Sequence, residues 1–184
     1  WRQSIGEYRT VDEKRVGAPT GTQYPTDVLV SPDWVEARLD QFTADDPDLR
    51  LLEVDVNTAF YDTAHVPGAA CVDWRTDLRS ADSHDILAPD EMASFLGSHG
   101  ITTETTVVVY GDNSNWFAAH LYWQLTYYGH PDVRIMDGGR EYWMDYGYPT
   151  TTDSVNLPTV EYGRSLAPPA KPGVRAYRDD VQDA

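Results

Sequence analysis

Apolar and polar residues alternate along the chain in two kinds of block. Short runs rich in β-branched and aliphatic residues predict strands, and longer segments with apolar residues three or four positions apart predict helices between them. The predicted strands cover residues 28–30, 49–56, 69–74, 105–110 and 133–136. This alternation favours an α/β fold with a mainly parallel central sheet and helices on both faces.

Proline, serine and glycine mark where the predicted helices begin and end. Ser31 caps a helix that has Pro32 at its first position. Pro89 begins a second helix, which Gly100 terminates. Two further predicted helices cover residues 116–128 and 140–146.

The junction after the strand at 105–110 carries the candidate chemistry. That strand is apolar without alternation, as in the centre of a parallel sheet covered on both faces. The loop after it consists of Gly111, Asp112, Asn113, Ser114 and Asn115. Free N–H groups at the start of the following helix face the crevice outside the strand ends, where such a loop can cradle an anion. The loop holds no Cys, His, Lys or Arg, so it is shaped for catalysis but lacks a strong nucleophile.

Several other segments, in register with this loop, carry a family pattern. They are Leu52-Glu-Val-Asp-Val-Asn57, Tyr61-Asp-Thr-Ala-His-Val-Pro-Gly-Ala69, Cys71-Val-Asp-Trp74, Gly129-His130, Val133-Arg-Ile-Met-Asp-Gly-Gly139, and Trp143 with Gly147 and Pro149. Over residues 28–151 their order resembles a rhodanese-type sulfurtransferase domain. Several motifs in register are far more specific than any one of them alone.

The departure from the family falls on its catalytic position. In active rhodaneses a sulfur-accepting cysteine follows the strand directly, and an arginine closes the loop about five residues later. Gly111 and Trp116 stand at these places here, so the resemblance implies that this chain has no catalytic residue. The Trp116-Phe117 pair and the segment at 73–77 resemble the first, silent domain of tandem thiosulfate sulfurtransferases.

The resemblance also implies a reaction and a partner. Thiosulfate gives its outer sulfur to the cysteine of the second domain, and the persulfide passes it to cyanide or another thiophilic acceptor. No metal or organic cofactor is implied. We expect the chain alone to be inactive, and we expect Trp116, Phe117 and Arg75 to face the missing C-terminal domain or the substrate cleft.

An internal repeat suggests the same organisation. Residues 174–181 align with residues 28–35 by pairing Val174 with Val28, Asp179 with Asp33 and Val181 with Val35. The sequence therefore predicts four segments, together with a second domain that this chain lacks. These are an N-terminal extension (1–27), the rhodanese-like domain (28–151), an extended strap with an interdomain linker (152–173), and the start of a second such domain (174–184). The missing initial Met agrees with a piece of a longer protein.

The charge balance is strongly acidic. The chain has 30 Asp and Glu against 14 Lys and Arg, a formal net charge of −16 and a pI near 4.4. Like charges on this scale repel one another in dilute buffer. At ~1 M salt the screening length falls to about 3 Å, which largely cancels this repulsion, so the charge balance suggests a halophile. The alternative is an ordinary acidic enzyme. The negative charge disfavours nucleic acid as a partner. No apolar run in the sequence is long enough to span a membrane. We expect a cytoplasmic protein.

Individual residues have competing interpretations. Cys71 lies on a strand, which favours a small buried hydrophobe over a reactive thiol. We expect Asp112 to cap the following helix, either as a simple cap or on amides that hold a persulfide or sulfate in active homologues. Ser114 lacks the Gly-x-Ser-x-Gly spacing of a hydrolase. The predicted structural residues are His65, Asp137 and His130, and no metal pattern links His84, His99 and His120.

Two other functions compete with the tandem sulfurtransferase. One is a complete, inactive rhodanese module that recognises an anion or a protein at its loop. The other is a phosphatase of related fold, which is disfavoured because that chemistry needs both the missing cysteine and the missing arginine. The aromatic residues Trp116 and Phe117 also have a structural alternative, which is packing against the sheet.

Overall fold

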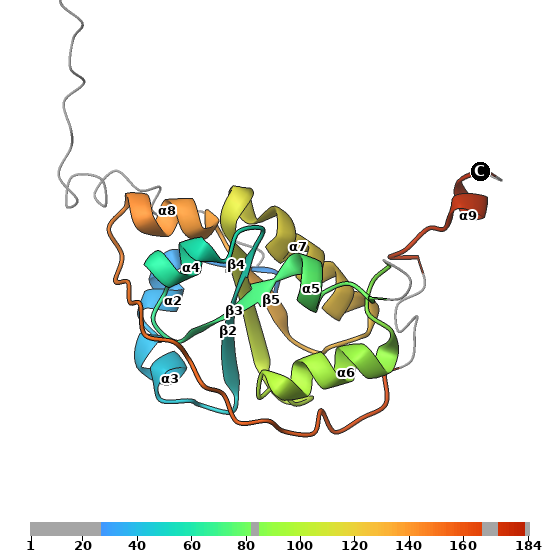
Figure 1. Cartoon of the computed structure of the whole chain (residues 1–184), viewed down its shortest axis with the longest axis horizontal. Helices are drawn as coiled ribbons and strands as arrows, with labels where there is room; N and C mark the ends of the chain where they lie inside the picture. The colour runs from blue at the N-terminus through green and yellow to red at the C-terminus, as the bar shows by residue number, and fades with distance from the viewer. Residues whose placement is uncertain (1–26, 82–84, 167–172, 183–184) are drawn as a thin grey trace, which may run out of the picture.

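A computed structural model describes residues 27–81, 85–166 and 173–182 (Figure 1). Within them, five parallel strands form one sheet in the order β1-β5-β4-β2-β3. The strands are β1 (Leu29–Val30), β2 (Leu49–Asp55), β3 (Ala69–Asp73), β4 (Thr106–Gly111) and β5 (Val133–Met136). Both the predicted parallel sheet and its five strands are confirmed, with small shifts at the strand ends.

Helices connect the strands and cover both faces of the sheet (Figure 1). They are α2 (Pro32–Glu36), α3 (Leu39–Thr43), α4 (Ala59–Thr63), α5 (Trp74–Asp77), α6 (Pro89–Ser98), α7 (Asp112–Tyr127), α8 (Gly139–Asp145) and α9 (Arg178–Gln182). The sequence predicted one helix after Ser31, whereas the structure divides it into α2 and α3 because Arg38, with φ −121°, leaves the helical region. The short helices α4 and α5 were not predicted.

The core consists of two hydrophobic clusters on opposite faces of the sheet. Val107 and Val109 of β4 point into the cluster that includes residues of α6 and α7. Val108 and Tyr110 point into the other cluster, which Phe42 of α3 and Trp143 of α8 help to fill. A strand that buries both of its faces needs an unbroken apolar sequence, which is why this run predicted a central strand.

An extended strap follows α8 and crosses the sheet at the amino ends of the strands (Figure 1). It begins at Thr151, whose backbone exchanges two hydrogen bonds of 2.9 Å with His65. It then passes α6, where the N–H of Val160 donates to the carbonyl of Gly97 over 2.9 Å. The predicted extended conformation is confirmed for the described part of the strap.

The predicted domain boundaries stay a prediction. Residues 1–26, 167–172 and 183–184 lie outside the described residues, and with them most of the predicted extension and linker and the end of the predicted second domain. Where the chain is described again it passes along α7 and forms α9. No helix of the described ranges is long and apolar enough to cross a bilayer.

Candidate functional site

The loop at the carboxyl end of β4 has an unusual backbone. Gly111 is still extended and pairs with Val54 of β2, and α7 begins at the next residue. Three residues then adopt left-handed conformations, with φ of 48° at Asn113, 56° at Ser114 and 65° at Asn115. Left-handed non-glycine residues are uncommon and collect at functional sites, where surrounding contacts hold them. Regular helical geometry follows from Trp116.

Asn115 holds this loop between β4 and β5. Its side-chain oxygen accepts from the N–H of Gly111 over 3.0 Å, and its amide nitrogen donates to the carbonyl of Met136 over 2.7 Å. Gly139, at φ +58°, approaches so closely that a Cβ there would lie 2.6 Å from the Asn115 side-chain oxygen. The loop is therefore fixed by a polar side chain and a glycine rather than by apolar packing.

Gly111 has no room for a side chain. A Cβ built on it would lie 2.1 Å from the carbonyl oxygen of Val54, far inside van der Waals contact. The resemblance predicts the catalytic cysteine of active rhodaneses at this position, and the neighbouring strand leaves no room for a side chain there.

Asp112 does not cap the helix as predicted. Its Oδ2 accepts from the N–H of Val56 over 3.3 Å, and its own N–H donates to Oδ1 of Asp55 over 3.1 Å. The prediction was wrong because the Asp112 carboxylate bonds to the residue that follows β2 and not to the first turn of the helix. Its Oδ1 is buried and has no hydrogen-bond partner among the described residues.

Two further acids lie beneath the loop, and sequence reasoning missed them. Glu53 and Asp55 of β2 are fully buried. Glu53 accepts from the hydroxyl of Tyr110 and from the guanidinium of Arg140, which also donates to the carbonyls of Phe60, at 2.7 Å, and Ala64. The available signal was two acids, separated by a single residue, in a strand whose other positions are mostly apolar.

Burial changes the protonation of both acids. Desolvation raises the pKa of Glu53 despite its bonds to Tyr110 and Arg140. Desolvation, followed by the negative charge of Glu53, raises the pKa of Asp55 to about 8. The raised pKa of Asp55 favours its neutral carboxylic acid over the carboxylate. The loop rests on a layer that carries more acid groups than cations.

An aromatic patch, formed by Trp74, Trp116 and Phe117, lies beside the loop. The Phe117 ring stacks on Trp74 at 4.3 Å and on Trp116 at 5.8 Å between centroids. Trp116 is 73% exposed, whereas Phe117 is half-buried and packs against the core. The guanidinium groups of Arg75 and Arg79 lie 5.9 and 5.5 Å from the Trp74 ring. The structure thus brings together the three residues expected at an interface, Trp116, Phe117 and Arg75.

The segment that precedes α9 runs along α7, the helix that carries part of this patch. The indole N–H of Trp123 donates to the carbonyl of Val174 over 2.7 Å. Arg175 forms an ion pair with Asp85 at 2.6 Å, and its guanidinium lies 4.7 Å from the Tyr177 ring. The chain therefore leaves the domain on the side of α7.

The other candidates have structural surroundings. Cys71 is half-buried, and desolvation raises the pKa of its thiol to about 12, which keeps it protonated. Ser114 is exposed. His65, His130 and Asp137 bond to neighbouring backbone or to Tyr162, as predicted for structural residues. His84 lies outside the described residues, and in the described ranges no three or more His, Cys, Asp or Glu residues could together hold a metal ion.

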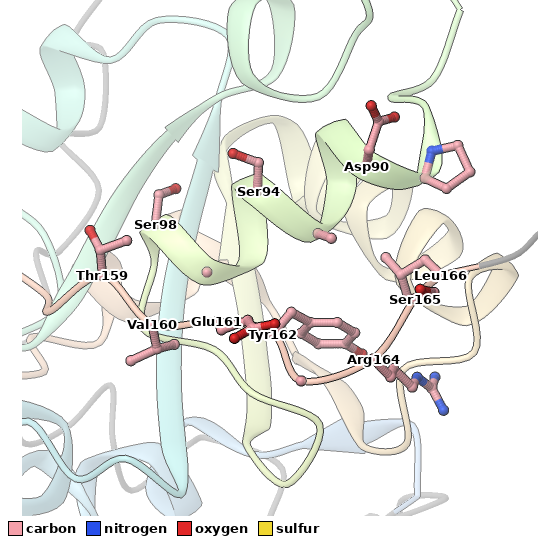
Figure 2. Close-up of a pocket in the computed structure, with 14 residues that line it drawn as sticks. Asp90, Ser94, Ser98, Thr159, Val160, Glu161, Tyr162, Arg164, Ser165 and Leu166 are labelled. Atoms are coloured by element: carbon pink, nitrogen blue, oxygen red, sulfur yellow. The ribbon is translucent and has the colours of Figure 1, made fainter.

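A groove of about 780 Å³ lies between α6 and the strap (Figure 2). Asp90 and Ser94 line it from the helix, and Glu161 and Arg164 line it from the strap. It shares no lining residue with the loop at 111–115. The candidate site therefore remains the loop and the aromatic patch beside it.

Comparisons with known proteins agree with this geometry. Residues 31–146 match the family model of the rhodanese-like domain. The chain is 50% identical over 165 residues to a relative from Haloferax volcanii that carries a thiosulfate sulfurtransferase name, and the match covers 90% of this chain and 57% of the relative. It is 44% identical over 155 residues to the sulfur carrier protein TtuD of Thermus thermophilus, covering 84% of this chain and 52% of that protein.

Solved structures give the same result. YnjE matches with a TM-score of 0.65 and 28% identity, over 78% of this chain and 35% of that one. An EanB variant solved in complex with ergothioneine matches with a TM-score of 0.70 and 28% identity, over 90% of this chain and 42% of that one. This chain spans just over half the length of the two curated relatives, 57% and 52%. The Haloferax match also agrees with the halophile that the charge balance suggested.

Proposed function

The chain belongs to the rhodanese family, and on that premise we propose that it is the non-catalytic N-terminal domain of a cytoplasmic thiosulfate sulfurtransferase with two rhodanese domains. In this reaction the cysteine thiolate of the second domain attacks the outer sulfur of thiosulfate, the sulfur–sulfur bond breaks and sulfite leaves. Cyanide or another thiophilic acceptor then takes the sulfur from the persulfide and regenerates the thiolate. These steps need no metal or organic cofactor.

The observation that carries the proposal is Gly111. The cysteine position is filled by a glycine whose missing side chain would collide with the carbonyl oxygen of Val54 at 2.1 Å. The rest of the loop keeps an ordered backbone, because Asn115 bonds to both β4 and β5. A retained scaffold without a nucleophile fits a domain that completes another domain's site.

Two observations support a second domain in the parent protein. The chain spans 57% and 52% of two curated relatives, so those proteins contain nearly as much chain again. In addition, α9 begins at Arg178, which the repeat pairs with Pro32, the first residue of α2, and α9 continues to Gln182, one residue past the end of the repeat. A helix in the same place of the repeat is what the start of a second rhodanese-like domain requires.

In this proposal the aromatic patch is one wall of the cleft that holds the persulfide. Trp116, 73% exposed, is available to contact the second domain and keep water from the reactive sulfur. The guanidinium groups of Arg75 and Arg79 beside the Trp74 ring are donors that suit the oxygens of thiosulfate, a dianion.

The test compares this chain alone with the same chain fused to the C-terminal half of the Haloferax relative. We expect no thiocyanate from thiosulfate and cyanide in high salt for the chain alone, and turnover for the fusion. Trp116→Ala in the fusion is expected to lower kcat/KM while leaving the Tm of the single chain unchanged. Robust thiocyanate formation by the chain alone would refute the proposal. A kcat/KM of the fusion that Trp116→Ala does not change would favour the inactive binding module instead.

A further inference from the structure

Residues 174–177, which precede α9, are held by α7 and by the loop before α6. The indole N–H of Trp123 donates to the carbonyl of Val174 over 2.7 Å, and the Val174 side chain packs against the core cluster that includes residues of α7. Arg175 donates to both carboxylate oxygens of Asp85, over 2.8 and 2.6 Å. A hydrogen bond, an ion pair and apolar packing therefore hold this short segment together.

Aromatic rings fix the position of the Arg175 guanidinium. It lies 5.9 Å from the Tyr127 ring of α7 and 4.7 Å from the Tyr177 ring. Tyr127 is buried and stacks on Trp123 with 6.0 Å between centroids, so the core holds the ring against which the guanidinium lies. A bidentate arginine–carboxylate pair that also contacts aromatic rings has a more specific geometry than an ordinary surface pair. These contacts therefore fix the direction in which the chain continues to α9.

The helix that follows this segment has no core of its own. α9 buries none of its residues and lies apart from the sheet (Figure 1). Its Val181 is 68% exposed, whereas Val35, the residue of α2 with which the repeat pairs it, is fully buried. Tyr177, whose carbonyl accepts from the N–H of Val181 over 3.2 Å, is also exposed. These apolar side chains suit a second rhodanese-like domain in which α9 takes the place of α2.

The held segment also has a counterpart in the repeat. The repeat pairs Val174 with Val28, the residue directly before β1. The carbonyl of Val28 accepts from the N–H of Ile135 over 2.8 Å, whereas the carbonyl of Val174 accepts from Trp123. A carbonyl oxygen has two lone pairs and can accept from two donors. Val174 can therefore lead into the first strand of a second sheet while it stays bonded to α7.

The aromatic patch and the contacts to residues 174–177 lie on the same side of α7. Regular helical geometry begins at Trp116, and Trp123 follows seven residues later. Residues at that spacing share one face of a helix and lie about 10 Å apart along its axis. A domain that is tied to Trp123 can therefore reach the exposed ring of Trp116.

We propose that Trp123, Tyr127 and Asp85 form a docking site for the first strand of the second rhodanese-like domain, and that this site fixes the orientation of that domain over the aromatic patch. The inference rests on the proposed function, in which the second domain supplies the reactive cysteine. One helix carries both Trp116 of the patch and Trp123 of the docking site, so the distance between them is fixed. The three residues of the docking site are positioning residues, since they act on turnover only through the placement of the second domain.

The experiment uses the fusion of this chain to the C-terminal half of the Haloferax relative. Trp123→Phe removes the indole donor and keeps a ring, and Asp85→Asn removes the charge that pairs with Arg175. In this double variant we expect kcat/KM for thiosulfate to fall about tenfold or more, because misplacement of reacting groups by ~1 Å can cost about 100-fold. The control is Asp132→Asn, which breaks the surface pair with Arg134 and should keep kcat/KM within about twofold.

Two further readouts separate misplacement of the second domain from unfolding. Trp116→Ala should lower kcat/KM when the docking site is intact, and should have little further effect in the double variant, because the second domain then no longer covers Trp116. Small-angle X-ray scattering should give a larger radius of gyration for the double variant than for the unmodified fusion. The far-UV circular dichroism of the two proteins should be the same.

Each outcome decides between the two proposals. An unchanged kcat/KM and radius of gyration in the double variant would overturn the docking site, and the proposed function would stand if the unmodified fusion turns over. An unmodified fusion without turnover would contradict the proposed function, and scattering alone would then decide on the docking site. If the double variant does not fold, Asp85→Asn alone serves, because the Asp85 side chain is 51% exposed.

Discussion

At the carboxyl edge of the sheet, where the loop lies, Glu53, Asp55 and Asp112 are buried around one cation, Arg140. Among the described residues, Asp55 Oδ2 and Asp112 Oδ1 have no hydrogen-bond partner. At the amino edge, where the strap crosses, a buried charge is balanced differently. Nε of Arg50 has no hydrogen-bond partner in the described part of the chain, but the guanidinium forms a 2.8 Å ion pair with Asp45, whose side chain is 45% exposed.

The comparison shows which edge of the sheet lowers the stability of the fold. Unpaired buried acids cost free energy, and a pair that reaches solvent avoids most of that cost. The carboxyl edge also holds three left-handed residues in succession, at 113–115. Proteins retain such features mainly at functional sites. The carboxyl edge is therefore built as a site although Gly111 leaves it without a nucleophile.

The largest expected effect comes from removing the cation of the carboxyl edge. Arg140→Met leaves Glu53 buried without its ion pair and removes the guanidinium donor from the carbonyls of Phe60 and Ala64. We expect the free energy of unfolding, measured by urea titration at pH 7, to fall by about 3–5 kcal/mol.

The surface ion pair between Arg134 and Asp132 is the control. Its side chains are 25% and 36% exposed, so Arg134→Met should cost less than ~1 kcal/mol. The double variant Glu53→Gln with Arg140→Met should recover part of the larger loss, because no unpaired charge remains. Equal losses for Arg140→Met and Arg134→Met would show that the two edges do not differ in this way.

The next effect is a pH dependence that originates at Asp55. Its pKa is raised from 3.8 to about 8 in the folded chain, so between those pH values the folded state keeps a proton that the unfolded state has lost. Stability from this group is complete below pH ~4 and falls as the pH rises to about 8, by at most about 1.4 kcal/mol per pH unit. The raised pKa of Glu53 acts in the same direction.

Asp55→Asn should flatten this slope, because an amide keeps its hydrogen-bonding capacity without titrating. Urea titrations of both proteins at pH 5, 6, 7 and 8 measure it. A slope unchanged by Asp55→Asn would mean that Asp55 is ionised in the folded chain at neutral pH.

At each edge of the sheet one glycine lies against a neighbouring backbone carbonyl, and substitution of that glycine tests how close the approach is. A Cβ at Gly111 would lie 2.1 Å from the carbonyl oxygen of Val54, and one at Gly97 would lie 2.4 Å from that of Val160. Overpacking of this kind costs about 1–3 kcal/mol, so Gly111→Ala and Gly97→Ala should each lower stability by that amount.

Gly111→Cys should match Gly111→Ala in stability and should form no thiocyanate. Since Gly111 is extended at φ −178°, backbone strain does not enter the comparison. An active, fully stable Gly111→Cys chain would contradict the conclusion that β2 closes this position.

Features that depend on local sequence were predicted well. The apolar run of β4, the proline that begins α6 and the glycine that ends it come from nearest-neighbour chemistry, and the structure confirms them. The buried acids of β2 could not be predicted in the same way, because their partners are distant in sequence. Tyr110 and Arg140, the partners of Glu53, are 57 and 87 residues away, and Asp112, the partner of Asp55, is 57 residues away. Asp112 was misjudged for a related reason, since its partner, Val56, becomes a neighbour only through the pairing of β2 with β4.

The smallest expected effect concerns the aromatic patch itself. Trp116 is 73% exposed, so Trp116→Ala should change the free energy of unfolding by less than ~0.5 kcal/mol. Phe117 is half-buried between Trp74 and the core, so Phe117→Ala should cost about 1–2 kcal/mol. Urea titration of both variants in high salt measures the difference. A large loss for Trp116→Ala would assign this ring to the packing of the single domain. A negligible loss would leave it as a large apolar surface that the domain does not need for its own stability, which is what a contact with a second domain requires.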